Sequence, residues 1–182
     1  MFCKKSHAKA LKTLKDSLSK YSKHVITDIE DIQKEGLTST ALLVEVLDDV
    51  KNFERALPFF GIMVTAISCK DGKISAGISV MNFPALGEIY YAENGRGAWL
   101  ERIASNFTGA SRTRVSGVAN VSDSLVSIPS EQSDQLGKKF HHIRYFNSHI
   151  YSLALLICGK IDAFVIPQSS VSSHGIRLFT LE

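Results

Sequence analysis

The sequence predicts a globular protein of mixed helices and strands, with either an α+β or a layered α/β fold. Apolar residues recur at helical spacing near the amino terminus, apolar runs alternate with Asp-Gly and Asn-Gly turns, and a long apolar segment precedes Gly159. Of the 182 residues, 45% are hydrophobic and 21% are charged, which is too apolar for a disordered chain. This length allows one sizeable core or two small subdomains.

Helices are expected at both ends of the chain. Residues 6–22 carry three leucines at positions i, i+3 and i+7, which form one narrow apolar stripe among lysines. Residues 147–158 are apolar and helical in length, Gly159 is expected to end that helix, and Lys160 follows near the negative end of its dipole. A last helix is expected to begin at residue 173 and to run to residue 182.

The strands follow from short apolar runs. Residues 41–47 are apolar on both sides apart from Glu45, which indicates a buried central strand. Asp71-Gly72 and Asn94-Gly95 are strong hairpin signals, so the middle of the chain is expected to form an antiparallel meander. The predicted strands are residues 25–29, 41–47, 59–69, 73–81, 88–93, 98–101, 112–115, 125–128, 143–146 and 161–166.

Positive charge is concentrated near the amino terminus. The net charge is +3, yet residues 4–23 contain seven lysines and a single acid, Asp16. One interpretation is the solvated face of a helix. The other is a contact with RNA or another polyanion, because clustered positive charge displaces counterions. No aromatic-rich RNA-binding motif accompanies the lysines.

The bulk features predict a cytoplasmic protein that does not enter the membrane. No uncharged apolar stretch is long enough to span a bilayer, and the residues after Met1 do not form the apolar run of a signal peptide. The three cysteines, Cys3, Cys69 and Cys158, lack metal-ligand spacing and are expected to be reduced thiols.

A pair of acids at the end of the predicted strand 41–47 is the first candidate for chemistry. Glu45 and Asp48 lie three residues apart where the strand runs into a turn, an arrangement that presents carboxylates to a divalent cation. The alternative is that both are exposed acids at a strand end. His141, His142 and His149 could also suggest a metal, but acid or cysteine partners at zinc-site spacing are lacking.

Several motifs in the same order resemble those of the inositol monophosphatases, including their bacterial extragenic-suppressor branch. Residues 45–53 are similar to the metal motif Asp-Pro-(Leu/Ile)-Asp-Gly-(Thr/Ser)-Thr-Asn-Phe. The other matching segments are Pro58-Phe59-Phe60, residues 88–100, Arg114-Val115-Ser116, and Ser148 with residues 159–164.

The resemblance implies the fold of the sugar-phosphatase group. This fold is a layered α/β/α/β sandwich with mixed, largely antiparallel sheets. The resemblance also implies that the fold is incomplete at both ends of the chain. Residues 1–120 would then form the amino-terminal part, and residues 121–182 a partial carboxyl-terminal part.

The resemblance also implies a chemistry, namely magnesium-dependent hydrolysis of inositol monophosphate or a similar sugar phosphate. Glu45 and Asp48 match the two motif acids that bind the metal. Asp28 is the best positional match for a further metal-binding glutamate, and Glu30 is the second; the alternative for both is a solvated turn.

Four residues match positions that contact the substrate or its phosphate: Asp49, Val50, Asn147 and Ser148. Asp49 stands in place of the glycine that receives the phosphate, and its carboxylate would repel a dianion. Val50 stands in place of the Thr/Ser that orients water and has no hydroxyl.

Two later family acids are also replaced. The Trp-Asp that supplies another metal ligand falls near Val171 and Ser172, and the substrate-binding glutamate corresponds to Ile166. His174 is a further candidate ligand, although a lone histidine is more often polar surface.

These departures predict a degenerate member of the family, with catalysis absent or severely impaired. One alternative is a residual phosphatase that binds a single Mg²⁺ through Asp28, Glu45 and Asp48. Another is a non-catalytic module that binds RNA, the transcription machinery or a partner protein. A third is a relic without a selected function. A homo-oligomer is expected because an incomplete fold exposes sheet edges and apolar sheet surface.

Overall fold

The computed structural model describes residues 2–28, 30–34, 39–70, 73–103, 109–128, 136 and 138–166. The helices are α1 (Phe2–Leu18), α2 (Glu30–Lys34), α3 (Val50–Glu54) and α5 (His149–Ile157), with a 3-10 turn η1 at Val121–Asp123. The strands are β1 (Val25–Ile26), β2 (Thr40–Asp48), β3 (Gly61–Lys70), β4 (Lys73–Phe83), β5 (Glu88–Glu93), β6 (Gly97–Arg102), β7 (Ala110–Arg112), β8 (Leu125–Ser127), β9 (His142–Arg144) and β10 (Ala163–Phe164).

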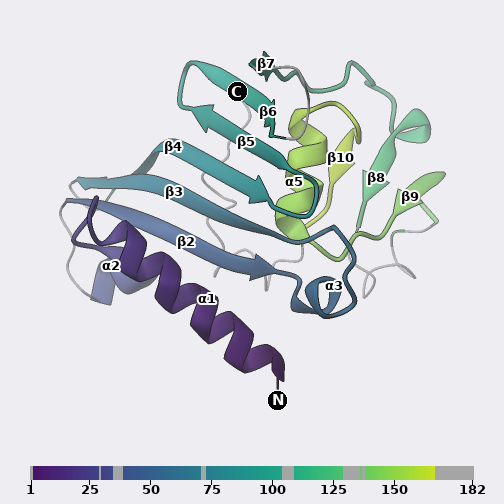
Figure 1. Cartoon of the computed structure of the whole chain (residues 1–182). Coiled ribbons are helices and arrows are strands. Elements are labelled where there is room, and N and C mark those ends of the chain that lie inside the picture. Colours follow the sequence, from purple (N-terminus) through teal and green to yellow (C-terminus); the bar gives the residue numbers. More distant parts are fainter. Residues whose placement is uncertain are drawn as a thin grey trace.

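A seven-stranded sheet in the order β1 to β7 forms the centre of the molecule (Figure 1). β1 pairs with β2 in parallel, and every later pair is antiparallel, so the predicted meander is confirmed. The last strand lies at residues 110–112, earlier than the predicted 112–115, because Ala110 pairs with Glu101 and Arg112 pairs with Trp99. The Asp71-Gly72 turn and the helix expected at 173–182 lie outside the described residues.

A second, three-stranded sheet has the order β10-β8-β9 and is parallel throughout. The expectation of largely antiparallel sheets therefore holds for the large sheet. The small sheet can be parallel because α5 and the chain around it carry the connection between β9 and β10. How the chain divides near residue 120 stays a prediction.

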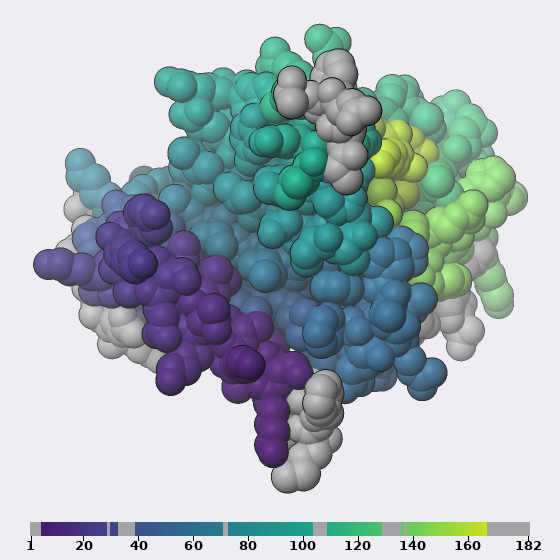
Figure 2. Space-filling model, viewed as in Figure 1, coloured from purple at the N-terminus to yellow at the C-terminus, as the bar shows by residue number. Residues whose placement is uncertain are grey.

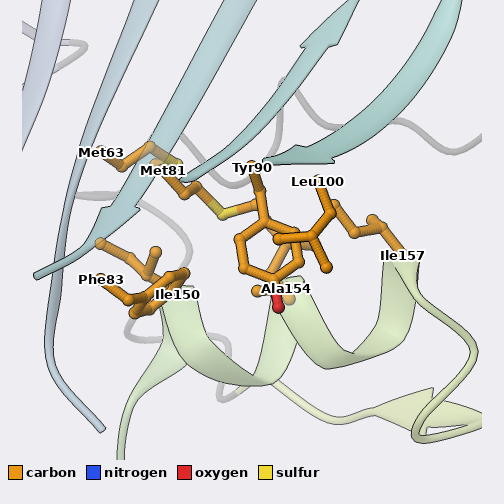
Figure 3. Packing of buried hydrophobic residues seen from close by; sticks show 9 residues of the cluster. Met63, Met81, Phe83, Tyr90, Leu100, Ile150, Ala154 and Ile157 are labelled. Atoms are coloured by element: carbon orange, nitrogen blue, oxygen red, sulfur yellow. The ribbon is translucent and has the colours of Figure 1, made fainter. Parts of the chain in front are cut away.

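α5 lies between the two sheets and forms the main hydrophobic core (Figure 3). Its apolar face packs on side chains from four neighbouring strands of the large sheet, with Phe83 and Tyr90 in edge-to-face contact. The core residues are Met63, Met81, Phe83, Tyr90, Leu100, Ile150, Leu153, Ala154 and Ile157. Toward the small sheet, the Ser152 and Ser127 hydroxyls form a buried 2.8 Å hydrogen bond.

α1 lies over β2 on the other side of the large sheet (Figure 1). Successive residues of a strand point to opposite faces, and β2 is buried on both faces: Leu43 on the α5 side and Val44 and Val46 on the α1 side. The layers are therefore α1, large sheet, α5 and small sheet, which is the expected α/β/α/β order. In the described part of the chain, no helix is long and apolar enough to cross a membrane.

Candidate functional site

A β-bulge at the end of β2 brings the two acids of the motif to one face of the sheet. In a regular strand, residues three apart point to opposite faces. Here Val46 pairs with Ile62 and Asp48 with Gly61, so Leu47 is an extra residue, and its φ of 58° is left-handed. Asp48 therefore points to the same face as Glu45, toward α5.

The Asp48 carboxylate joins β2 to the first turn of α5. Its Oδ2 accepts a 2.5 Å hydrogen bond from the Ser148 hydroxyl and a 2.9 Å hydrogen bond from the Ile150 backbone amide. Ser148 is the N-cap of α5, and its Oγ accepts from the Tyr151 amide. A negative carboxylate is favourable at this end because the helix dipole is positive there.

Burial changes the proton affinity of both acids. Desolvation, with repulsion from Asp48 as the second cause, raises the pKa of Glu45 to about 8. Desolvation also raises the pKa of Asp48, against the opposing effect of the bonds from Ser148 and Ile150. At neutral pH the pair therefore favours a proton on Glu45, while the two donors stabilise charge on Asp48.

The turn after β2 is held by Asp49 and Asn52. Asp49 has a φ of 55° and is the N-cap of α3, where its Oδ1 accepts a 2.9 Å bond from the Asn52 amide. The Asn52 side chain is buried and donates to the Phe59 carbonyl at 2.9 Å and to the Phe146 carbonyl at 3.0 Å. One amide side chain thus ties the acidic turn both to the entry of β3 and to the segment before α5.

Two cavities flank this turn. One, of about 400 Å³, opens toward α5 and the small sheet; the other, of about 360 Å³, opens toward α1. The first is lined by Asp49, Val50, Lys51, Ser127, Ile128, Asn147, Ser148, His149, Ser152 and Phe164. The second is lined by His7, Leu11, Thr27, Val44, Glu45, Val46, Leu47, Asp48, Asp49 and Val50.

The structure thus brings six of the sequence-predicted site residues to these cavities: Glu45, Asp48, Asp49, Val50, Asn147 and Ser148. Asn147 is exposed and left-handed, with a φ of 56°, whereas Ser148 is buried. Asp28 and Glu30 line neither cavity. Asp28 is half-buried and precedes α2, where its Oδ1 accepts a hydrogen bond from the amide of Glu30, the exposed first residue of that helix.

The remaining candidates are dispersed. His149 lines the first cavity, but His141 and His142 are exposed, and His142 is the first residue of β9, where the sequence predicted a strand at residues 143–146. Ile166 packs against the core around α5. Val171, Ser172 and His174 lie outside the described residues.

The described residues do not complete a magnesium site. Mg²⁺ takes near-octahedral oxygen ligands, of which carboxylates are the protein's main contribution. Glu45 and Asp48 supply two carboxyl groups, and among the described residues no group of three or more His, Cys, Asp or Glu side chains could hold a metal ion. Ligating carboxylates must also be deprotonated, and burial of Glu45 opposes this.

Comparison with known proteins shows which proteins this chain resembles. No family model matches the chain. It is 29% identical over 129 residues to a fructose-1,6-bisphosphatase/inositol-1-monophosphatase of Thermotoga maritima, a match that covers 68% of this chain and 46% of that protein. The solved extragenic suppressor protein of Bartonella henselae has the same fold, with a TM-score of 0.69 at 23% identity over 90% of this chain and 66% of that one. The chain is related to the inositol monophosphatase family.

A second curated relative is a different phosphatase. A histidinol-phosphatase of Chlorobaculum parvum is 36% identical over 84 residues, which is 46% of this chain and 28% of that protein. The chain spans less than half the length of these two curated relatives.

Sequence reasoning missed several lining residues. It also missed Asn52, which bridges the turn without lining either cavity. Asn52 matches the asparagine of the inositol monophosphatase motif, so that match could have indicated its bridging role. His7 and Thr27 line the second cavity because α1 and β1 pack beside β2. No local sequence pattern predicts those contacts. Lys51 and Phe164 come from distant segments and were also missed; they line the first cavity with His149, which the sequence had offered as a candidate ligand.

Proposed function

We propose that this chain is an inositol monophosphatase-type protein whose site binds a phosphorylated small molecule weakly and hydrolyses it poorly or not at all. Inositol monophosphate and similar sugar phosphates are the substrate class that the family resemblance suggests. The two curated relatives carry the names of different phosphatases, so the proposal commits to the phosphomonoester and leaves the alcohol open.

The observation that carries the proposal is that the acids of the motif serve the fold. Asp48 accepts two hydrogen bonds from the start of α5, and Asp49 accepts the amide of Asn52 at the start of α3. Asp49 lines both cavities, and its carboxylate would repel an incoming phosphate. Val50, also lining both, cannot orient a water molecule because its side chain has no hydroxyl.

A lysine and a histidine favour residual binding of an anion. Both Lys51 and His149 line the 400 Å³ cavity. The volume falls within the range of small-molecule sites. Removing electrostatic elements of a hydrolytic site costs about 100-fold or more each, which is why binding can outlast catalysis.

The test restores the two family residues in the double variant Asp49→Gly/Val50→Thr. Inositol 1-phosphate, histidinol phosphate and p-nitrophenyl phosphate are offered to the natural chain and to the variant, with and without Mg²⁺, while released phosphate is measured. We expect no magnesium-dependent release from the natural chain and detectable release from the variant.

Asp48→Asn is the control in both backgrounds, because it keeps the side-chain shape and removes the charge. Magnesium-dependent hydrolysis by the natural chain that disappears in Asp48→Asn would overturn the proposed impairment. Titration calorimetry with Mg²⁺ or Mn²⁺ on the same proteins reports whether the acid pair holds a metal independently of turnover.

Self-association stays a prediction. Ile78 is 49% exposed and Val80 is 36% exposed, on the face of the large sheet opposite α5. Sedimentation equilibrium over a range of concentrations tests it, and a monomer at every concentration would contradict it.

A further inference from the structure

A basic surface lies on the outer side of α1 and on the turn that follows it. Lys5, Lys9 and Lys12 are exposed and are spaced four and three residues apart, so they project from one side of the helix. Lys20 and Lys23, also exposed, continue the charge beyond the end of α1 at Leu18. We call these five lysines, together with Tyr21, the α1 basic surface.

The charges of this surface are available to a partner. In the described part of the chain, none of the five lysines forms an ion pair. Asp16 is the one acid of α1, and it follows Lys12 by about one turn. The lysines therefore outnumber the local acid five to one, whereas the whole chain carries a net charge of only +3.

The apolar side of α1 is already used by the fold. Leu11, Leu14 and Leu18 are half-buried, and Leu11 lines a cavity together with Val44 and Val46 of β2. A helix that binds a bilayer surface needs its apolar face to insert between the lipids. Because this face packs on the sheet, the charge on the outer side fits a water-soluble polyanion better than a membrane.

Tyr21 adds an aromatic ring to the same surface. The residue is 83% exposed, more than the other exposed large apolar residues in the described part of the chain, and it stands between Lys20 and Lys23 in the sequence. Exposed aromatic rings beside cationic side chains are stacking platforms for unpaired bases. Bases in a duplex are already stacked, so this feature favours a single strand.

We propose that the α1 basic surface binds single-stranded nucleic acid, with the lysines on the phosphate backbone and Tyr21 stacked on a base. Figure 2 shows that α1, in purple, has one side open to the outside of the molecule. By helical spacing, Lys5, Lys9 and Lys12 lie on the opposite side of α1 from Leu11, which lines a cavity of the candidate site. Nucleic-acid binding is therefore independent of the proposed phosphatase-type site, and either can fail without the other.

The experiment measures binding of a fluorescein-labelled oligouridylate to the whole chain by fluorescence anisotropy over a series of salt concentrations. The triple variant Lys5→Glu/Lys9→Glu/Lys12→Glu should weaken binding at least tenfold. It should also make the slope of log K against log salt shallower by about 2, since each phosphate contact contributes about 0.7 on a single strand. Tyr21→Ala should weaken binding about tenfold and leave the slope unchanged, while Tyr21→Phe should bind like the natural chain.

The matched control is Lys70→Glu/Lys138→Glu/Lys139→Glu, which makes the same change of charge at exposed lysines on other elements. It should change affinity less than threefold. Lys5→Gln/Lys9→Gln/Lys12→Gln repeats the test without introduced negative charge, and the circular dichroism of each variant verifies folding.

Three results would overturn the proposal: no binding of the oligonucleotide, equal losses in the control triple variant, or a duplex of the same sequence bound as tightly as the single strand. Phosphatidylserine vesicles are offered in parallel. Binding to vesicles without binding to the oligonucleotide would assign the surface to a membrane instead.

Discussion

The two ends of α5 differ in what their residues do. At the carboxyl end, Gly159 turns the chain with a φ of 64°, and Asp162 Oδ2 accepts a 2.7 Å hydrogen bond from the Leu125 amide. A bond from Ser116 is the main cause that lowers the pKa of Asp162. At the amino end, Asp48 bonds to the helix while Asp49 and Val50 face the cavities. The first end serves only the fold, whereas the second was expected to carry chemistry.

The difference shows which part of a family resemblance reports structure. Gly159, Asp162 and Asn52 match the family motifs, and each has a packing or hydrogen-bonding role here. Glu45, Asp49 and Val50 depart from the motif, and all three lie at the cavities. The resemblance therefore supports the scaffold more strongly than the reaction.

The greatest change in stability is predicted for the buried acids at the amino end of α5. The folded pKa of Glu45, about 8, lies above its ordinary value of 4.5, so the folded state binds the proton more tightly. This contribution to stability is complete below pH 4.5 and is lost as pH rises through 8. In chelator-treated buffer, the free energy of unfolding should fall by roughly 4 kcal/mol between pH 5 and pH 8.

Urea denaturation at each pH measures this fall. Glu45→Gln keeps the shape of the side chain without its titration and should flatten the pH dependence. If the free energy of unfolding of Glu45→Gln falls with pH as steeply as that of the natural chain, another group causes the pH dependence.

The next-largest change in stability is predicted at the carboxyl end of α5. A Cβ at position 159 would lie 2.9 Å from the Ser116 nitrogen and 3.0 Å from the Arg114 oxygen, and the φ is left-handed as well. Gly159→Ala should lower the free energy of unfolding by about 3 kcal/mol, because strain and a backbone clash add.

Gly95→Ala is the matched control for that variant. Gly95 has a similar φ of 74°, but no atom lies within 4 Å of the added Cβ. It should cost only about 1 kcal/mol. Equal losses at the two glycines would mean that the close approach of residues 114–116 contributes nothing.

The smallest change in the free energy of unfolding is predicted for two neighbouring acids, Asp48 and Asp49. Asp48→Ala removes the acceptor of two hydrogen bonds and leaves the Ser148 and Ile150 donors without it, which should cost about 2 kcal/mol at pH 5. Asp49→Ala removes one capping bond from a half-buried site and should cost about 1 kcal/mol. Thermal melts of both variants measure the difference, and the opposite order would show that Asp48 does not hold α5.

Elements with local sequence signals could be predicted from the chain alone. The Asn-Gly turn and alternating runs specify the meander, since hairpin geometry depends on adjacent residues, and Gly159 ends α5 because glycine accepts a positive φ. The acidic motif was likewise found at the end of its strand. The five-residue helices α2 and α3 were missed because so short a helix carries no periodic signal.

How those elements pack against one another depends on long-range contacts. Glu45 and Asp48 share a face only through the bulge at Leu47, which depends on pairing with β3. The cavities are made by side chains from α1, β2, α5 and the small sheet, and β7 exists because β6 offers an edge to pair with. Such contacts join residues far apart in the chain, so their free energy is set by packing and hydrogen bonding across elements and not by any local pattern.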